Sequence, residues 1–178
     1  MKAFTYIISA VFAYFVSGLN PAIIMSKAIY KKDIRTCGSG NPGFTNFKRV
    51  FGNKYAWFVF VLDILKGAVI SVVAGLLFRA YVGSWALGVA YAGLFAMLGH
   101  AFPIYYGFKG GKGFLVCLST VWFIDWRAGA IATAVLVIML PLTKYMSLST
   151  MSALVAGAVA VAAFGGGLAV SSMYAVCV

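Results

Sequence analysis

A polar, glycine-rich run interrupts an otherwise apolar sequence and carries residue types that bind phosphate. The run spans residues 37–46, reads CGSGNPGFTN, and is followed by Lys48 and Arg49. Glycine permits positive φ and close backbone approach, and successive N–H groups in such a turn form a concavity that binds anions. The run holds three glycines suited to this role, namely Gly38, Gly40 and Gly43.

Side chains of the same run add hydrogen-bond donors for an anion. Arg49 can hold a phosphate through two parallel N–H···O bonds, and a helix beginning near Thr45 would direct its N-terminal amides toward the same anion. No GK[ST] sequence follows at the Walker spacing, which argues against a nucleotide. The alternative is a turn whose cations lie at the membrane interface. The candidate donors are Ser39, Asn41, Thr45, Asn46 and Arg49.

A second basic, glycine-rich run spans residues 108–113 and reads FKGGKG. A glycine beside a lysine lets backbone N–H groups and an ammonium group share one anion. The run therefore predicts a second phosphate contact, and its alternative is a basic turn at the membrane interface. The candidate residues are Lys109, Gly110, Gly111 and Lys112.

Three ionisable residues lie within apolar segments. Asp63 and Lys66 have the i, i+3 spacing of a helical ion pair, and His100 is the single histidine of the sequence. Ionisable groups inside membrane spans are functional candidates, and Asp63 and His100 could serve chemically as a general base. The alternatives are a structural ion pair and a histidine that packs between helices. Asp33 and Arg35 either orient the first run or are solvated.

The composition indicates an integral membrane protein. Of 178 residues, 63% are hydrophobic and 10% are charged, whereas soluble domains average about 25% charged residues. The net charge of +11 is spread over short loops, which favours positive-inside bias and anion binding over nucleic acid. Cys37, Cys117 and Cys177 form no CxxC pair and predict neither a disulfide framework nor a metal site.

Apolar segments predict an all-α protein with about six transmembrane helices in a single polytopic domain, residues 1–178. A crossing needs about 20 residues, and four segments reach this length: 3–25, 56–78, 84–106 and 149–170. The first lacks an obvious small-x-small cleavage site, so we expect it to be retained and kinked at Asn20-Pro21. Segments 114–126 and 128–143 are shorter and predict tilted spans or a hairpin.

The charges predict the orientation of these spans. Ten lysines and arginines lie in the loops on the side of the two glycine-rich runs, against three on the other side. Positive residues accumulate in cytoplasmic loops, so we expect both runs to face the cytoplasm and the N-terminus to lie outside. The ten are Lys27, Lys31, Lys32, Arg35, Lys48, Arg49, Lys54, Lys109, Lys112 and Lys144, and the three are Lys2, Arg79 and Arg127.

The order of these motifs over roughly residues 5–150 resembles the bacterial acyl-phosphate:glycerol-3-phosphate acyltransferase family. The family's GSGNPGATN loop is matched with Phe44 in place of alanine, and its FKGGKG loop is matched in full. The matching residues run in order through Asp33-x-Arg35, residues 38–49, Asp63-x-x-Lys66-Gly67, Gly99-His100-x-Phe102-Pro103 and residues 108–113.

The resemblance implies a seven-helix enzyme of phospholipid synthesis in the bacterial inner membrane. Its members transfer a fatty acyl group from acyl phosphate to the 1-hydroxyl of glycerol 3-phosphate, giving lysophosphatidic acid and phosphate. The sequence itself shows no set of metal ligands and no nucleotide or coenzyme A site, so we expect no cofactor. By this resemblance, the first run holds one phosphate, and Lys112, with Lys109 second, holds the other. The candidate catalytic residues are Ser39, Arg49, Asp63, His100 and Lys112. The oligomeric state is not indicated.

The family is also expected to carry a third motif, H-x-x-N-x-x-R-L-x-x-G-x-E, after a last span. Residues 171–178 read SSMYAVCV and do not match it. An alternative function is therefore a catalytically impaired member that acts as a membrane scaffold or lipid-binding protein. A transporter for a phosphorylated solute is a further alternative, but such proteins often show inverted repeats, and no internal symmetry is evident in this sequence.

Overall fold

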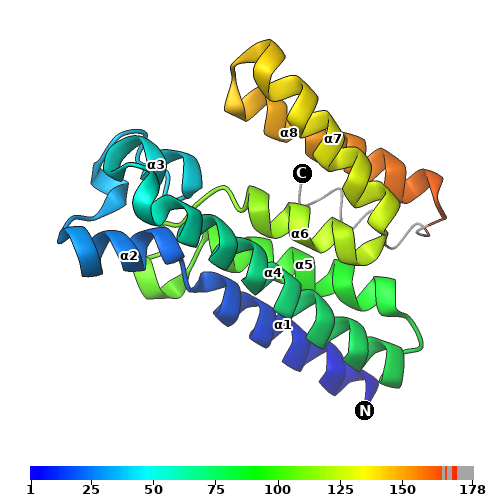
Figure 1. The fold of residues 1–178 in the computed structure, drawn as a ribbon. Coiled ribbons are helices and arrows are strands. Elements are labelled where there is room, and N and C mark those ends of the chain that lie inside the picture. Colours follow the sequence, from blue (N-terminus) through cyan, green and yellow to red (C-terminus); the bar gives the residue numbers. More distant parts are fainter. Residues whose placement is uncertain (166, 168–169, 172–178) are drawn as a thin grey trace.

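The structure is a computed structural model that describes residues 1–165, 167 and 170–171. Within those residues the secondary structure is entirely helical, as the sequence predicts (Figure 1). The α-helices are α1 (Lys2–Gly18), α2 (Pro21–Tyr30), α3 (Phe44–Phe51), α4 (Asn53–Tyr81), α5 (Trp85–Ala101), α6 (Phe114–Ile124), α7 (Trp126–Thr143) and α8 (Met146–Ala163). Two short 3₁₀ helices are η1 (Ile34–Thr36) and η2 (Ile104–Tyr106).

The predicted kink at Asn20-Pro21 is a complete break between two helices. α1 ends at Gly18, and the Asn20 side chain caps α2 by accepting a hydrogen bond from the Ile23 amide at 3.1 Å. Pro21 follows as the first helical residue, where its missing N–H costs no intrahelical bond. The two helices together still form one candidate membrane span, Lys2–Tyr30, as the sequence predicts for residues 3–25, but a polar cap starts a new helix within it.

Five described helical stretches are long and apolar enough to cross a membrane, with α1 and α2 counted together. α6 has 11 residues and rises only about 16 Å, which is short of a hydrocarbon core of about 30 Å. The predicted shortness of segment 114–126 is thus confirmed, whereas α7 reaches 18 residues. Six crossings and an outside N-terminus stay predictions. Segment 149–170 and residues 171–178 lie partly outside the described residues.

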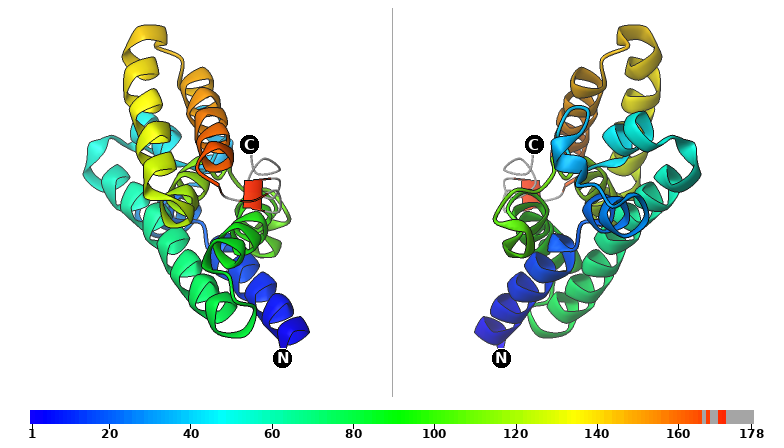
Figure 2. Two further views of the ribbon diagram at one scale, coloured as in Figure 1. Left: turned by 90° about the vertical axis from the view of Figure 1, so that its right-hand side faces the viewer. Right: turned by 90° about the vertical axis from the view of Figure 1, so that its left-hand side faces the viewer.

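Small residues let the central helices approach closely. A Cβ on Gly67 of α4 would lie 2.9 Å from Ser119 Cβ of α6, and one on Gly93 of α5 would lie 2.6 Å from Thr120 Cγ2. Such small-residue contacts are typical of helices packed in membranes. α1, α4, α5 and α6 form one body, and the α7–α8 hairpin diverges from it (Figure 2). This packing carries the ends of α2 and α5, and the loops that follow them, to one region of the molecule.

Candidate functional site

The two glycine-rich loops meet at one end of the helices. We call residues 31–43 the first loop and residues 102–113 the second loop. The Arg35 guanidinium of the first loop donates from Nη1 to the Tyr106 carbonyl at 2.9 Å and to the Lys109 carbonyl at 3.2 Å. The second loop therefore lies against the first, although more than 70 residues separate them in the sequence.

Arg35 is held in place by a carboxylate on its own loop. Its Nε donates to Asp33 Oδ1 at 3.0 Å, and its Nη2 donates to Asp33 Oδ2 at 2.7 Å. Lys27 Nζ lies 3.2 Å from the same Oδ2. The Arg35 guanidinium holds the pKa of the Asp33 carboxyl well below its usual range, and Asp33 in turn raises the pKa of Arg35. Asp33 and Arg35 thus orient the loops, which was one of the two predicted alternatives.

The first loop is shaped by buried amide side chains. Asn46 Nδ2 donates to the Cys37 carbonyl at 2.9 Å, and Asn46 Oδ1 accepts from the Ser39 amide at 2.9 Å. Asn20 Nδ2 donates to the Pro42 carbonyl at 3.1 Å. Because Asn46 is only 2% exposed and uses both ends of its amide in these bonds, it shapes the loop in this structure.

Two of the three predicted loop glycines require their positive φ. Gly38 and Gly40 have φ of 58° and 72°, whereas Gly43 has extended backbone with φ of −151°. Gly43 therefore does not use the positive φ that glycine permits. Gly43 instead stands at the N-cap of α3, the helix that was predicted near Thr45 and that begins at Phe44.

Polar groups of the first loop and α3 remain available on the surface. Ser39 and Arg49 are exposed, and Asn41 and Thr45 are half-buried. Thr45 lies in the first turn of α3, where backbone amides favour negative charge. Lys48 lies over the Trp57 ring, 5.9 Å from its centre. The predicted phosphate-binding donors are therefore spread over the first loop, the first turn of α3 and, for Arg49, the last turn of that helix.

The second loop folds back onto the end of α5. The Gly110 amide donates to the Ala101 carbonyl and the Gly111 amide donates to the His100 carbonyl, both at 3.0 Å. We expected these two amides to bind a phosphate. In this structure both donate to carbonyls of the protein instead. The ammonium groups of Lys109 and Lys112 are on exposed side chains, which leaves them as the cations that this loop offers.

A cleft of about 560 Å³ lies where the two loops meet. It has a size suited to a small ligand and carries cationic groups from both loops. The first loop contributes Asp33, Arg35, Thr36 and Gly40, and the second contributes Tyr106, Gly107, Lys109 and Gly110.

A buried polar cluster lies inside the helices next to the second loop. Lys66 Nζ lies 2.8 Å from Asp63 Oδ1 and 2.9 Å from His100 Nδ1. The same ammonium donates to the carbonyls of Ser17 and Leu19 at the end of α1, at 3.1 and 3.2 Å. The predicted Asp63–Lys66 pair is confirmed, and His100 joins it. The cluster links α1, α4 and α5.

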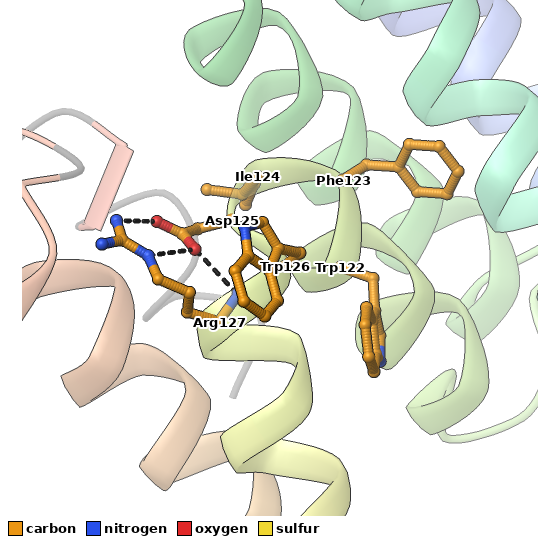
Figure 3. A pocket seen from close by; sticks show the side chains of 6 residues that line it. All are labelled: Trp122, Phe123, Ile124, Asp125, Trp126 and Arg127. Atoms are coloured by element: carbon orange, nitrogen blue, oxygen red, sulfur yellow. Dashed lines mark hydrogen bonds and ion pairs between the residues drawn. The ribbon is translucent and has the colours of Figure 1, made fainter.

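A second hollow of about 460 Å³ lies at the far end of α6 (Figure 3). Its charged groups are Asp125 and Arg127, which pair with each other through Arg127 Nη2 and Asp125 Oδ2 at 2.7 Å. Because the pair neutralises its own charge, this hollow lacks the excess of cations that a phosphate site needs. Among the described residues, no three His, Cys, Asp or Glu side chains gather as a metal-binding cluster.

Sequence reasoning missed three contacts that organise the loops. The Asn20 bond to the Pro42 carbonyl and the Asn46 bond to the Cys37 carbonyl span 22 and 9 residues, and the Arg35 contact with Tyr106 spans 71. Side-chain amides inside glycine-rich runs could have suggested a role in loop shape, since Asn side chains bond readily to nearby backbone. Nothing in the local sequence indicates the acceptors of Arg35, which are backbone carbonyls.

Comparisons with known proteins agree on one family. The sequence model of the glycerol-3-phosphate acyltransferase family matches residues 7–178. The glycerol-3-phosphate acyltransferase of Thermoanaerobacter pseudethanolicus is 39% identical over 146 residues, which cover 82% of this chain and 71% of the relative. That of Francisella philomiragia is 39% identical over 145 residues, which cover 82% and 69%.

Solved structures show the same fold. The crystal structure of PlsY (YgiH), an integral membrane glycerol 3-phosphate acyltransferase, in its glycerol 3-phosphate form superposes with a TM-score of 0.87. That match has 28% identity and covers 97% of this chain and 84% of the other. Its lysophosphatidic acid form superposes with a TM-score of 0.84, covering 97% and 83%.

Proposed function

This chain belongs to the glycerol-3-phosphate acyltransferase family, and on that premise we propose that it transfers a fatty acyl group from acyl phosphate to the 1-hydroxyl of glycerol 3-phosphate. The products are lysophosphatidic acid and inorganic phosphate. The observation that carries the proposal is the meeting of two cation-bearing loops at one end of a membrane-spanning bundle. Both substrates carry a phosphate, so the reaction needs cationic groups from two directions.

The proposed phosphate-binding residues divide into two groups, and of these Lys109 lines the cleft between the loops. Arg49 and the surface donors at the start of α3 hold one phosphate, and the exposed ammonium groups of Lys109 and Lys112 hold the other. Positive charge placed beside the departing phosphate stabilises the transition state, and two anchored phosphates hold the hydroxyl against the acyl carbon. The donors of the first group are Ser39, Asn41, Thr45 and Arg49.

The reaction forms one ester bond and breaks one acyl–phosphate bond. The glycerol oxygen attacks the acyl carbonyl carbon, the phosphate leaves with the electron pair of the broken bond, and the hydroxyl proton must pass to a base. Asp63 and His100 are directed toward Lys66 inside the helices. We therefore assign the proton to an oxygen of a bound substrate phosphate, which is the remaining base at the reacting atoms.

The membrane supplies the place for the acyl chain. Large apolar side chains are exposed on the outer faces of the helices, including Leu65 on α4 and Val137 on α7, and these faces suit lipid. We place the two loops on the cytoplasmic side of the bacterial inner membrane, since ten of the loop lysines and arginines lie on that side. The acyl chain then lies along the helices in the membrane while both phosphates stay at the loops.

The test is lysophosphatidic acid production by the purified chain in lipid, given acyl phosphate and glycerol 3-phosphate. Arg49→Ala and Lys112→Ala should each lower turnover at least about 100-fold, as expected when a group that stabilises transition-state charge is lost. Lys54→Ala is the matched control, because Lys54 is an exposed cation near α3 that lies over Tyr55. An ordered wild-type chain without turnover would overturn the proposal and favour a scaffold or lipid-binding role.

A further inference from the structure

Two Asp-x-Arg motifs in this protein have the same local geometry. In the first, the Arg35 amide and Nε both donate to Asp33 Oδ1 at 3.0 Å, and Nη2 donates to Oδ2 at 2.7 Å. In the second, the Arg127 amide and Nε donate to Asp125 Oδ1 at 2.8 and 3.1 Å, and Nη2 donates to Oδ2 at 2.7 Å. Each arginine is therefore locked to a carboxylate two residues earlier (Figure 3 shows the second).

The motifs differ in what the remaining face of the guanidinium contacts. Arg35 Nη1 donates to the carbonyls of Tyr106 and Lys109 on the second loop. The Arg127 guanidinium instead lies over the Phe164 ring, 4.2 Å from its centre. Arg35 is also more enclosed, with 23% of its side chain exposed against 47% for Arg127. One motif joins two loops, and the other closes a turn between α6 and α7.

We propose that Arg35 is a positioning residue that holds the second loop, and with it the ammonium groups of Lys109 and Lys112, at the correct distance from the first loop. The inference rests on the proposed function for its kinetic part. The bond to the Lys109 carbonyl acts on the same residue that presents one of the phosphate-binding cations. Because this bond holds the backbone of Lys109, it limits the positions that the Lys109 ammonium group can reach.

The chemistry of the guanidinium explains why arginine is needed. Arginine has five N–H donors in a rigid, planar fork, so it can face a carboxylate on one side and carbonyls on the other. A lysine at position 35 would keep the positive charge, but its single nitrogen cannot reproduce the arrangement in which Nε and Nη2 of Arg35 face the two Asp33 oxygens while Nη1 faces the carbonyls of the second loop. Arg35→Lys therefore removes the hydrogen-bonded bridge between the loops and keeps the positive charge at position 35.

The experiment compares Arg35→Lys with the matched control Arg127→Lys in the purified, lipid-reconstituted chain. Hydrogen–deuterium exchange measures the protection of backbone amides in the two loops. Initial rates at varied concentrations of each substrate measure kcat/KM. Arg35→Lys should speed exchange across residues 102–113 and lower kcat/KM about 10- to 100-fold, with thermal stability close to wild type. Arg127→Lys should leave both the exchange of residues 102–113 and kcat/KM unchanged. Unchanged exchange in the second loop for Arg35→Lys would overturn the proposal.

A double-variant cycle gives a readout that a purely structural role would not produce. If Arg35 positions Lys109, then Lys109→Ala should cost less activity in the Arg35→Lys background than in the wild type, because interacting residues are not additive. In the Arg127→Lys background, Lys109→Ala should lower activity by the same factor as it does in the wild type. Equal costs in all three backgrounds would overturn the positioning role. Wild-type protein without turnover would instead refute the proposed function, and the exchange experiment would still decide whether Arg35 joins the loops.

Discussion

The Lys66 ammonium lies 2.9 Å from Nδ1 of His100, so a cation on α4 meets the single histidine of the sequence at the end of α5. An ammonium has only donors, so Nδ1 accepts the bond and the imidazole proton sits on Nε2. A Cβ on Gly111 would lie 2.6 Å from that Nε2. The buried cluster is thus in direct contact with the backbone of the second loop.

We expect Lys66→Met to destabilise the protein by about 3–5 kcal/mol, because removing one partner of a buried ion pair leaves the other charge uncompensated. Asp63 would be the uncompensated group, since it is 3% exposed. The double variant Asp63→Asn/Lys66→Met should recover part of the loss. Thermal unfolding in detergent measures all three proteins, and a double variant less stable than Lys66→Met would contradict the pairing.

We expect His100→Asn to retain activity within about tenfold of wild type, because Nδ1 of His100 is bound to Lys66 inside the helices. A general base typically contributes about 10²–10⁴-fold, so its loss would be much larger. Steady-state kinetics across pH 6–9 shows whether His100 acts as a positioning residue or as the general base. A loss above 100-fold, together with loss of a titration in the pH–rate profile, would make His100 the base.

Gly111→Ala should disrupt the contact between the loops. Its Cβ would lie 2.6 Å from His100 Nε2 and 3.0 Å from the Pro42 carbonyl, and such overpacking typically costs about 1–3 kcal/mol. Gly107→Ala is the comparison, since a Cβ there meets nothing within 4 Å and is strained only by its φ of 63°. We expect activity to fall further in Gly111→Ala than in Gly107→Ala. The reverse order would contradict this packing.

The Asp33–Arg35 pair should stabilise the protein across the neutral pH range. The folded-state pKa of Asp33 is lowered, chiefly by its hydrogen bond to Arg35, so its contribution is fully present above the unfolded value of about 3.9 and is lost as pH falls through the folded value. The difference in Tm between wild type and Asp33→Asn should therefore be constant from pH 8 to 5 and shrink below about pH 4. A difference that changes between pH 8 and 6 would contradict it.

The sequence by itself determined the class of protein and the residue types that its candidate site offers. Apolar segments of helical length, separated by short basic loops, predicted an all-α membrane protein, because lipid leaves backbone groups no partners except each other. Glycine and lysine in the two runs predicted phosphate binding through their residue types alone. The ion pair of Asp63 and Lys66 followed from a spacing of three, which any helix brings onto one face.

The tertiary structure decided which groups of each run are turned outward and which are used within the protein. Asn46 shapes the first loop, the amides of Gly110 and Gly111 bond to the end of α5, and Arg35 joins the loops across 71 residues. These assignments depend on which backbone carbonyls come near each donor. Backbone carbonyls are the same in every residue type, so their positions follow from helix packing and leave no mark in the sequence.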